Sequence, residues 1–381
     1  MIVFTISLFL IVHSYIFYPA ILYLLNRIKR TNSIDGNKVK NQPDVSIIIS
    51  VFNEEKIIKQ RIENLFLLDY PKEKIEILIG SDCSSDSTNS IVEEYKNKGI
   101  TLIAFHDRRG KASVLNDLAS TAKNEILVFS DANTFYDKDV LKKFTNNFND
   151  RTIGGVCGYL QLRTSEDNSG GKGESFYWEY ENRIKELEGN YYTTFGATGA
   201  IYAIRKSLFK PLPTHKAIMD DFLIPMKVVE QGFRIVYDKT VFGWEEATDS
   251  AMKEFQRKIR IGAANFNCLT DIIHLLNPKY GFVAIGLFSH KIIRWFVPFL
   301  LLIVFLTSFK LRDGSEIFQI IFNLQLIFVG LAVIGYFLDK LSFPVKIFTL
   351  PYYFLLANLG LMIGFYRFLR GSQKATWSVT R

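Results

Sequence analysis

Short β-favouring runs alternate with helical patterns between residues 44 and 134, and each run stops at a polar turn. The runs occupy residues 45–51, 75–79, 101–105 and 126–129. This alternation predicts an α/β domain in which a parallel sheet is covered by helices on both faces. Ligands of such sheets bind just beyond the carboxyl ends of the strands. We therefore expect the polar turns to meet along one sheet edge and to form a binding site there.

The four turns carry side chains that suit a nucleotide diphosphate. Acidic and amide groups can accept from a uracil or a ribose hydroxyl, a lysine at a helix start can meet phosphate, and paired oxygen donors suit a hard divalent cation. For any one acid, a turn residue or a helix N-cap is the simpler interpretation, but four such turns in register favour a site. The residues are Asn53, Glu54, Asp82, Gly110, Lys111, Asp131 and Asn133.

Three further motifs follow in the second half of the domain. Gly196, Ala197, Thr198 and Gly199 form a small-residue segment that permits close approach of a ligand to the backbone, or simply tight packing. Asp220 and Asp221 are an acidic pair at the start of a helical pattern, where the helix dipole alone would favour them. Arg257, Lys258 and Arg260 form a basic cluster that suits either a leaving diphosphate or anionic lipid heads.

The two ends of the chain are membrane-like. Residues 1–25 are apolar and uncharged with a basic flank, which predicts an N-terminal transmembrane helix followed by a linker at residues 26–43. Residues 269–295 are expected to form interfacial helices, and residues 296–369 further transmembrane helices. Residues 370–381 form a basic tail that should lie inside. Four simple spans from an outside N-terminus would put this tail outside, so the span count stays open.

Composition narrows the class of protein. The net charge is +8, from 46 basic and 38 acidic residues, and much of the excess lies beside apolar segments. That placement favours a cytoplasmic membrane face over nucleic acid. The three cysteines have no zinc-finger spacing and are interpreted as reduced thiols. No Walker loop and no Gly-x-Gly-x-x-Gly occurs, so NTPases and dinucleotide-binding enzymes lack their motif.

Four blocks together resemble the signature of inverting family 2 glycosyltransferases, including the hyaluronan, chitin and poly-N-acetylglucosamine synthase branch. They read Val-Ser-Ile-Ile-Ile-Ser-Val-Phe-Asn-Glu-Glu from residue 45, Ser-Asp-Cys-Ser-Ser-Asp-Ser-Thr from residue 81, Arg-Gly-Lys-Ala from residue 109 and Phe-Ser-Asp-Ala-Asn from residue 129. The resemblance implies a Rossmann-like GT-A fold over residues 44–268. It also implies a UDP-sugar donor and a Mg²⁺ or Mn²⁺ ion.

The resemblance assigns roles to the residues above. The first acidic turns with Gly110 and Lys111 would bind the donor nucleotide, and Asp131 with Asn133 would hold the metal, Asn133 standing where the motif has a second acid. The segment from Gly196 to Gly199, with Asp220, would line the donor sugar and the acceptor. The second member of the acidic pair, Asp221, would be the catalytic base. The basic cluster would stabilise the diphosphate.

Two products and a different class of protein remain open. The enzyme would add a single sugar to a lipid-linked acceptor, or it would extend and secrete a polysaccharide. Processive members carry Gln-x-x-Arg-Trp where this chain, aligned on Arg260, has Arg257 and Ile261, which favours single transfer. The partners would be membrane lipids and other polysaccharide-assembly subunits at the plasma membrane, with the catalytic domain cytoplasmic. A nucleotide-sugar-binding regulator would bind the donor without turnover. The near absence of charge inside the spans argues against a transporter.

Overall fold

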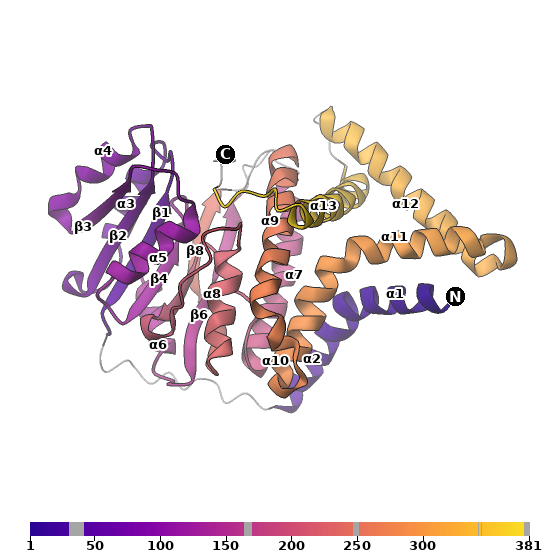
Figure 1. Ribbon diagram of the computed structural model, residues 1–381, viewed down its shortest axis with the longest axis horizontal. Helices are drawn as coiled ribbons and strands as arrows, with labels where there is room; N and C mark the ends of the chain where they lie inside the picture. The colour runs from indigo at the N-terminus through magenta and orange to yellow at the C-terminus, as the bar shows by residue number, and fades with distance from the viewer. Residues whose placement is uncertain (30–41, 164–169, 247–250, 342, 344, 377–381) are drawn as a thin grey trace.

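The computed structural model describes residues 1–29, 42–163, 170–246, 251–341, 343 and 345–376. An α/β domain lies on one side, and long helices extend from its other side (Figure 1). Of the linker expected at residues 26–43, residues 30–41 lie outside the described residues, as do residues 377–381 of the expected tail.

A mixed sheet forms the centre of the α/β domain. Within the described residues it has eight strands in the order β3-β2-β1-β4-β7-β6-β8-β5. Neighbours from β3 to β4 are parallel, which confirms the predicted alternation, whereas β7 runs antiparallel to both β4 and β6. The strands are β1 (Val45–Val51), β2 (Ile75–Asp82), β3 (Ile100–Phe105), β4 (Ile126–Ser130), β5 (Phe135–Tyr136), β6 (Ile153–Arg163), β7 (Tyr202–Arg205) and β8 (Arg234–Glu246).

Every residue of β1 is buried and most are apolar, because both faces of the strand are covered. Ile48 points into a core that includes Val114 and Leu118, whereas Ile47 and its neighbours on the opposite face pack with Ile58 and Ile62. Successive residues of β1 thus point to opposite faces of the sheet and pack into two separate cores. One core is covered by α3 (Ile58–Phe66), α4 (Thr88–Glu93) and α6 (Val140–Asn147), the other by α5 (Lys111–Thr121) and α8 (Asp220–Glu230).

Two long helices join the α/β domain to the apolar part of the chain. They are α7 (Gly170–Tyr191) and α9 (Ala251–Ile272). Helix α9 crosses α13 (Lys346–Leu369) at very close range. A Cβ on Gly364 would lie 2.6 Å from the carbonyl oxygen of Ile259 and 2.8 Å from the Cα of Gly262. The crossing therefore requires glycine at position 364.

Four helices in the described chain are long and apolar enough to cross a membrane, which indicates a membrane protein. They are Ile2–Ile28, Phe282–Gly314, Glu316–Lys340 and Lys346–Leu369. Many large apolar side chains on the first three face outward, as lipid contact requires. The first comprises α1 (Ile2–Val12), a π-helical turn (His13–Phe17) and α2 (Tyr18–Ile28). The second includes α10 (Phe282–Gly286), a π-helical turn (Leu287–Ile292) and α11 (Ile293–Leu311). The third is α12 (Glu316–Lys340).

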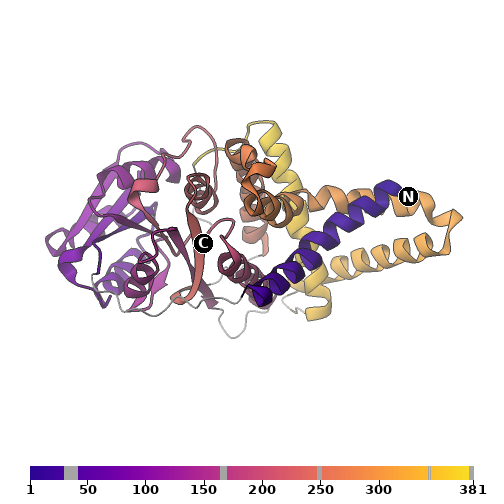
Figure 2. The same cartoon turned by 90° about the horizontal axis from the view of Figure 1, so that it is seen from below.

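The fourth helix has a different direction. Helices α1, α11 and α12 extend away from the sheet in both views, and α1 and α12 each contact α11 (Figures 1 and 2). Helix α13 is seen almost end-on in Figure 1 and runs across the others in Figure 2. The second candidate span begins at Phe282, so residues 282–295, expected as a separate interfacial segment, are continuous with it.

Buried charges join helix α7 to the apolar helices. Glu181 of α7 pairs with Arg294 of α11, and His290 lies 3.1 Å from Glu181 and 2.7 Å from Glu188. Tyr18 of α2 donates to Glu188 at 2.8 Å. Burial alone would raise the pKa of Glu181, but Arg294 and His290 outweigh burial and hold that pKa well below its ordinary value. The network thus joins α2, α7 and the second candidate span, which are distant in sequence.

Replacing Arg294 with alanine should destabilise the protein by about 3–5 kcal/mol, because Glu181 would be left buried without its strongest counter-charge. The measurement is the unfolding midpoint of the full chain in detergent. Arg183→Ala is the matched control on α7, since it removes only the exposed pair with Glu186 and should cost less than about 1 kcal/mol. Equal midpoints for the two variants would contradict a structural role for the buried pair.

Candidate active site

The ends of β1 and β2 form a paired turn at the carboxyl edge of the sheet. Asn53 and Cys83 adopt left-handed φ angles of 52° and 61°, which are strained conformations typical of functional turns. The Asn53 side-chain oxygen accepts from the backbone N–H of Ser85 at 2.8 Å, and the backbone N–H of Glu54 donates to Thr88 at 2.8 Å. The two predicted nucleotide-binding turns are therefore built as one unit.

Asp82 stabilises the loop that leads from β3 into α5. Its carboxylate is fully buried and accepts from the backbone N–H groups of Arg109 at 2.7 Å and Gly110 at 3.0 Å. It also accepts from Arg108 Nε at 3.1 Å, and the Arg108 guanidinium stacks on Phe52. Direct contact of Asp82 with a nucleotide stays a prediction. Its observed contacts orient the loop that leads into α5.

Gly110 occupies a position that other residues would strain. Its φ is +85°, a conformation that side chains disfavour. A Cβ there would also lie 2.9 Å from the carbonyl oxygen of Ala375, in the segment that follows α13. The C-terminal segment therefore lies against the loop that precedes Lys111, and Figure 1 shows this segment on the α/β side of α13.

Lys111, the first residue of α5, links the predicted metal motif to the predicted catalytic pair. Its Nζ lies 3.0 Å from Asp131 Oδ1 and 3.2 Å from Asp220 Oδ2. Burial alone would lower the pKa of Lys111, but Asp131 and Asp220 outweigh burial and raise it. A charged lysine therefore lies between the two acidic motifs, at the start of a helix where phosphate is favoured.

The small-residue segment holds the start of α8. The backbone N–H of Ala197 donates to the carbonyl oxygen of Asp221 at 2.7 Å. A Cβ on Gly199 would lie 3.2 Å from Asp221 Oδ2. Thr198 accepts a 2.9 Å hydrogen bond from Lys185 of α7. Gly196–Gly199 and the acidic pair thus form one part of the site.

Asp221 has the properties of a general base. Burial is the main cause that raises its pKa to about 6, the charge of Asp220 adds to this effect, and Lys111 and Lys185 oppose it. Its Oδ1 is buried and has no hydrogen-bond partner in the described part of the chain. A carboxylate with a free oxygen and a pKa close to neutrality is suited to accept a proton from a hydroxyl.

The three cations of the basic cluster do not share one environment. Arg257 bonds Glu254 through two nitrogens, at 2.6 and 3.0 Å, and Lys258 lies 3.4 Å from Glu254. Arg260 makes no ion pair or hydrogen bond within the described residues. Burial and nearby Arg257 lower the pKa of Arg260, whereas the carboxylates at 131, 220 and 221 act in the opposite direction. Arg260 is therefore close enough to these carboxylates for their charges to act on it.

Oxygen donors at the end of β4 fit a divalent cation. Asp131 presents a half-exposed carboxylate, and the side-chain oxygen of Asn133 is buried without a partner in the described residues. Such donors suit Mg²⁺ or Mn²⁺ when a diphosphate supplies further oxygens. Among the described residues, no group of three or more His, Cys, Asp or Glu side chains is arranged to hold a metal.

The sequence interpretation missed Lys185 and Glu245. Lys185 reaches Thr198 from the middle of α7, and Glu245 of β8 accepts a 3.1 Å hydrogen bond from Asn133. The one local signal for Lys185 is its spacing from Glu181 and Glu188, which puts three charged residues on one face of a helix. Glu245 had no local signal.

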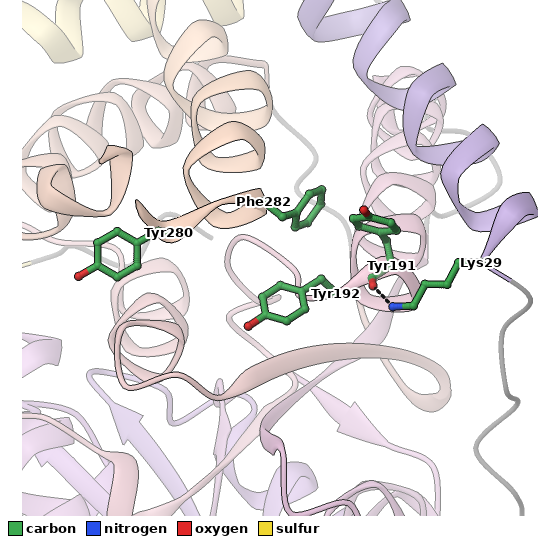
Figure 3. Close-up of a pocket in the computed structure, with 5 residues that line it drawn as sticks. All are labelled: Lys29, Tyr191, Tyr192, Tyr280 and Phe282. Carbon is green, nitrogen blue, oxygen red and sulfur yellow. Dashed lines mark hydrogen bonds between the residues drawn. The ribbon is translucent and has the colours of Figure 1, made fainter. Parts of the chain in front are cut away.

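A separate cavity of about 360 Å³ lies away from these residues (Figure 3). Tyr191 and Tyr192 follow one another at the end of α7, Lys29 follows α2, and Tyr280 and Phe282 flank the start of α10. Lys29 donates to the backbone oxygen of Tyr191. The combination of tyrosines and a lysine is typical of a membrane interface.

Three comparisons with known proteins agree with this geometry. The sequence profile "Glycosyl transferase family 2" matches residues 46–212. A probable glycosyltransferase, YdaM, of Bacillus subtilis is 24% identical over 240 residues, which cover 60% of this chain and 56% of that protein. Poly-beta-1,6-N-acetyl-D-glucosamine synthase of Staphylococcus aureus is 26% identical over 265 residues, which cover 67% of this chain and 61% of that protein. The chain thus spans less than two thirds of the length of both relatives.

The fold also matches a solved structure. The mannosyltransferase PcManGT from Pyrobaculum calidifontis, in complex with GDP-Man and Mn²⁺, has a TM-score of 0.71 and 20% identity, and the match covers 94% of this chain and 99% of that one. The sheet and its covering helices therefore have the GT-A fold of that structure. The family model matches the chain over residues 46–212 only, so this part of the chain contains a glycosyltransferase family 2 domain.

The raised pKa of Asp221 predicts an acid limb in the pH profile. Below pH about 6 the carboxyl is protonated and cannot accept a proton, so kcat/KM should fall about tenfold per pH unit there and level off above. Asp220→Asn removes a neighbouring negative charge and should move the limb to lower pH. The measurement is kcat/KM between pH 4.5 and pH 8. A limb that does not move in this variant would contradict the electrostatic origin of the shift.

Proposed function

We propose that this protein transfers a sugar from a nucleoside-diphosphate sugar to an acceptor hydroxyl in a single displacement with inversion. The observation that carries the proposal is the gathering of Lys111, Asp131 and the Asp220–Asp221 pair within one network of contacts. An anion-binding cation, an oxygen-donor motif and a base with a raised pKa are the groups that such a transfer requires.

The proposed reaction forms one bond to the anomeric carbon and breaks another. The acceptor oxygen forms a bond to the anomeric carbon while Asp221 takes the hydroxyl proton. The bond between the anomeric carbon and the diphosphate oxygen breaks, and the electron pair leaves with the nucleoside diphosphate. Lys111 and Arg260 neutralise the charge that develops on the leaving group. A divalent cation held by Asp131 and Asn133 would supply Lewis-acid stabilisation of the same diphosphate.

We assign the donor to the UDP-sugars on the resemblance of the turns at Asn53 and Asp82 to the family's nucleoside-binding blocks. The structural relative PcManGT carries GDP-Man, so GDP-mannose is the alternative donor to test. The acceptor is assigned as lipid-linked. A growing polysaccharide is the alternative, and the poly-N-acetylglucosamine synthase relative supports it.

We further propose three membrane spans with a cytoplasmic active site. If α1, α11 and α12 cross the membrane and α13 lies along its inner face, an outside N-terminus leaves both the catalytic domain and the C-terminal segment inside. Basic residues then lie on the inner side at the end of α2 and after α13, in agreement with the positive-inside rule. The tyrosine- and lysine-lined cavity of Figure 3 would lie at the same interface.

The experiment that tests the function uses membrane vesicles containing the full chain, Mg²⁺ or Mn²⁺, and a panel of labelled UDP-sugars with GDP-mannose. Label that enters the organic-extractable fraction and depends on Asp221 is the expected result. High-mass material degraded by a glycosidase would support the processive alternative instead. Donor binding without Asp221-dependent label for any donor would overturn the transferase proposal in favour of a regulator.

A further inference from the structure

Asn133 and Glu245 form a contact across two strands of the sheet. Asn133 lies between β4 and β5, and Glu245 lies near the end of β8, which pairs with β5. Asn133 Nδ2 is 3.1 Å from Glu245 Oε2. The strands next to this contact are fixed relative to one another, because Phe135 of β5 and Trp244 of β8 are register partners whose ring centroids stack 4.5 Å apart.

The chemistry of this contact determines which way the Asn133 amide points. A carboxylate only accepts hydrogen bonds, so the amide must turn its NH₂ group toward Glu245. The amide oxygen then points away from Glu245, and it is buried without a hydrogen-bond partner in the described residues. Leaving a buried oxygen without a partner is unfavourable. Binding of a cation would offset that cost.

We propose that Glu245 is a positioning residue for the divalent cation. It holds Asn133 with its oxygen toward the cation that Asp131 also binds, and its negative charge replaces the charge that the second acid of the motif would carry. The inference deepens the proposed function and rests on it. It also explains why an amide is suitable here: an aspartate at position 133 would place two carboxylates about 3 Å apart, where like charges oppose joint ionisation.

If Glu245 orients Asn133, the Mn²⁺ affinity of variants at these two positions should not simply follow the number of acidic residues. Glu245→Gln should weaken Mn²⁺ binding by about 10–100-fold, as loss of an orienting partner does in other metal sites. Asn133→Asp adds a ligand acid, yet it should bind Mn²⁺ no better than the natural chain. The double variant Asn133→Asp/Glu245→Gln restores both the net charge and the hydrogen bond, now from Gln to Asp, and should recover binding to within about threefold.

The experiment measures Mn²⁺ binding by electron paramagnetic resonance on the full chain in detergent, with UDP or GDP present and no turnover required. Glu246→Gln is the matched control, since it removes a neighbouring, exposed acid of the same strand. Unfolding midpoints of every variant verify folding, and the double variant supplies a folded test even if a single variant is unstable. The expected result is weak binding in E245Q and recovery in the double variant.

The outcomes separate this inference from the proposed function. If the natural chain takes up Mn²⁺ and E245Q binds it equally well, the role of Glu245 is overturned and the transferase proposal stands. If N133D alone binds more tightly, the charge argument is overturned. If transfer persists in a chelator and the natural chain binds no Mn²⁺ with either nucleotide, the inference is wrong while the transferase function is retained. If neither metal binding nor transfer is found, both are wrong.

Discussion

Replacing Asp221 with asparagine should lower kcat by about 10²–10⁴-fold, the range that a positioned general base contributes. Asparagine has nearly the same shape but cannot take the acceptor proton. Lys111 keeps its contacts with Asp131 and Asp220 in this variant, so the affinity for the nucleoside diphosphate should change less than about twofold, since no contact to the donor is lost. Turnover is measured in vesicles, and UDP or GDP binding by calorimetry in detergent.

The matched control for Asp221 is Glu230→Gln, at the opposite end of α8, where the acid pairs with Lys227. It should leave both kcat and binding unchanged. Full turnover in D221N would show that another group takes the proton. A parallel loss of nucleotide binding would show that Asp221 shapes the donor site rather than acting as the base.

The fold and the donor side of the site were predictable because local patterns encode them. The run Val45–Val51 is mostly apolar, with only two serines, because both of its faces are buried, and it ends just before Asn53 and Glu54. Parallel pairing of β1 with β2 and β4 then brings Asn53, Asp82 and Asp131 to one edge. The position of these residues follows from strand order alone.

Other parts of the site depend on long-range packing that no local pattern contains. Glu245 meets Asn133 only because β5 pairs with β8. The sequence shows three basic residues on α9 that look equivalent, yet in the structure Arg257 and Lys258 both form ion pairs with Glu254. Hydropathy gives α13 as a candidate span, but it does not show the close crossing of α13 with α9 at Gly364. In each case a distant contact decides the role.

The second large effect is expected at Arg260. Arg260→Gln should lower kcat by about 10²–10³-fold, because the leaving diphosphate would lose a preorganised cation at the moment its charge develops. Arg260 is close enough to the carboxylates of the site for their charges to act on it, and it makes no ion pair in the described chain, so its charge is available to a ligand. The measurement compares kcat with the affinity for UDP and GDP, across a range of salt concentrations.

Arg257→Gln is the matched control for Arg260, one helical turn away on α9. Arg257 is already bonded to Glu254. Loss of the Arg257 charge should therefore lower kcat by less than about tenfold, because this charge stabilises the ground state and the transition state about equally. If both variants lost activity equally, and anionic lipid restored it, the cluster would act by docking α9 on the membrane rather than on the diphosphate. A selective, lipid-independent loss in R260Q would place this single cation at the leaving group.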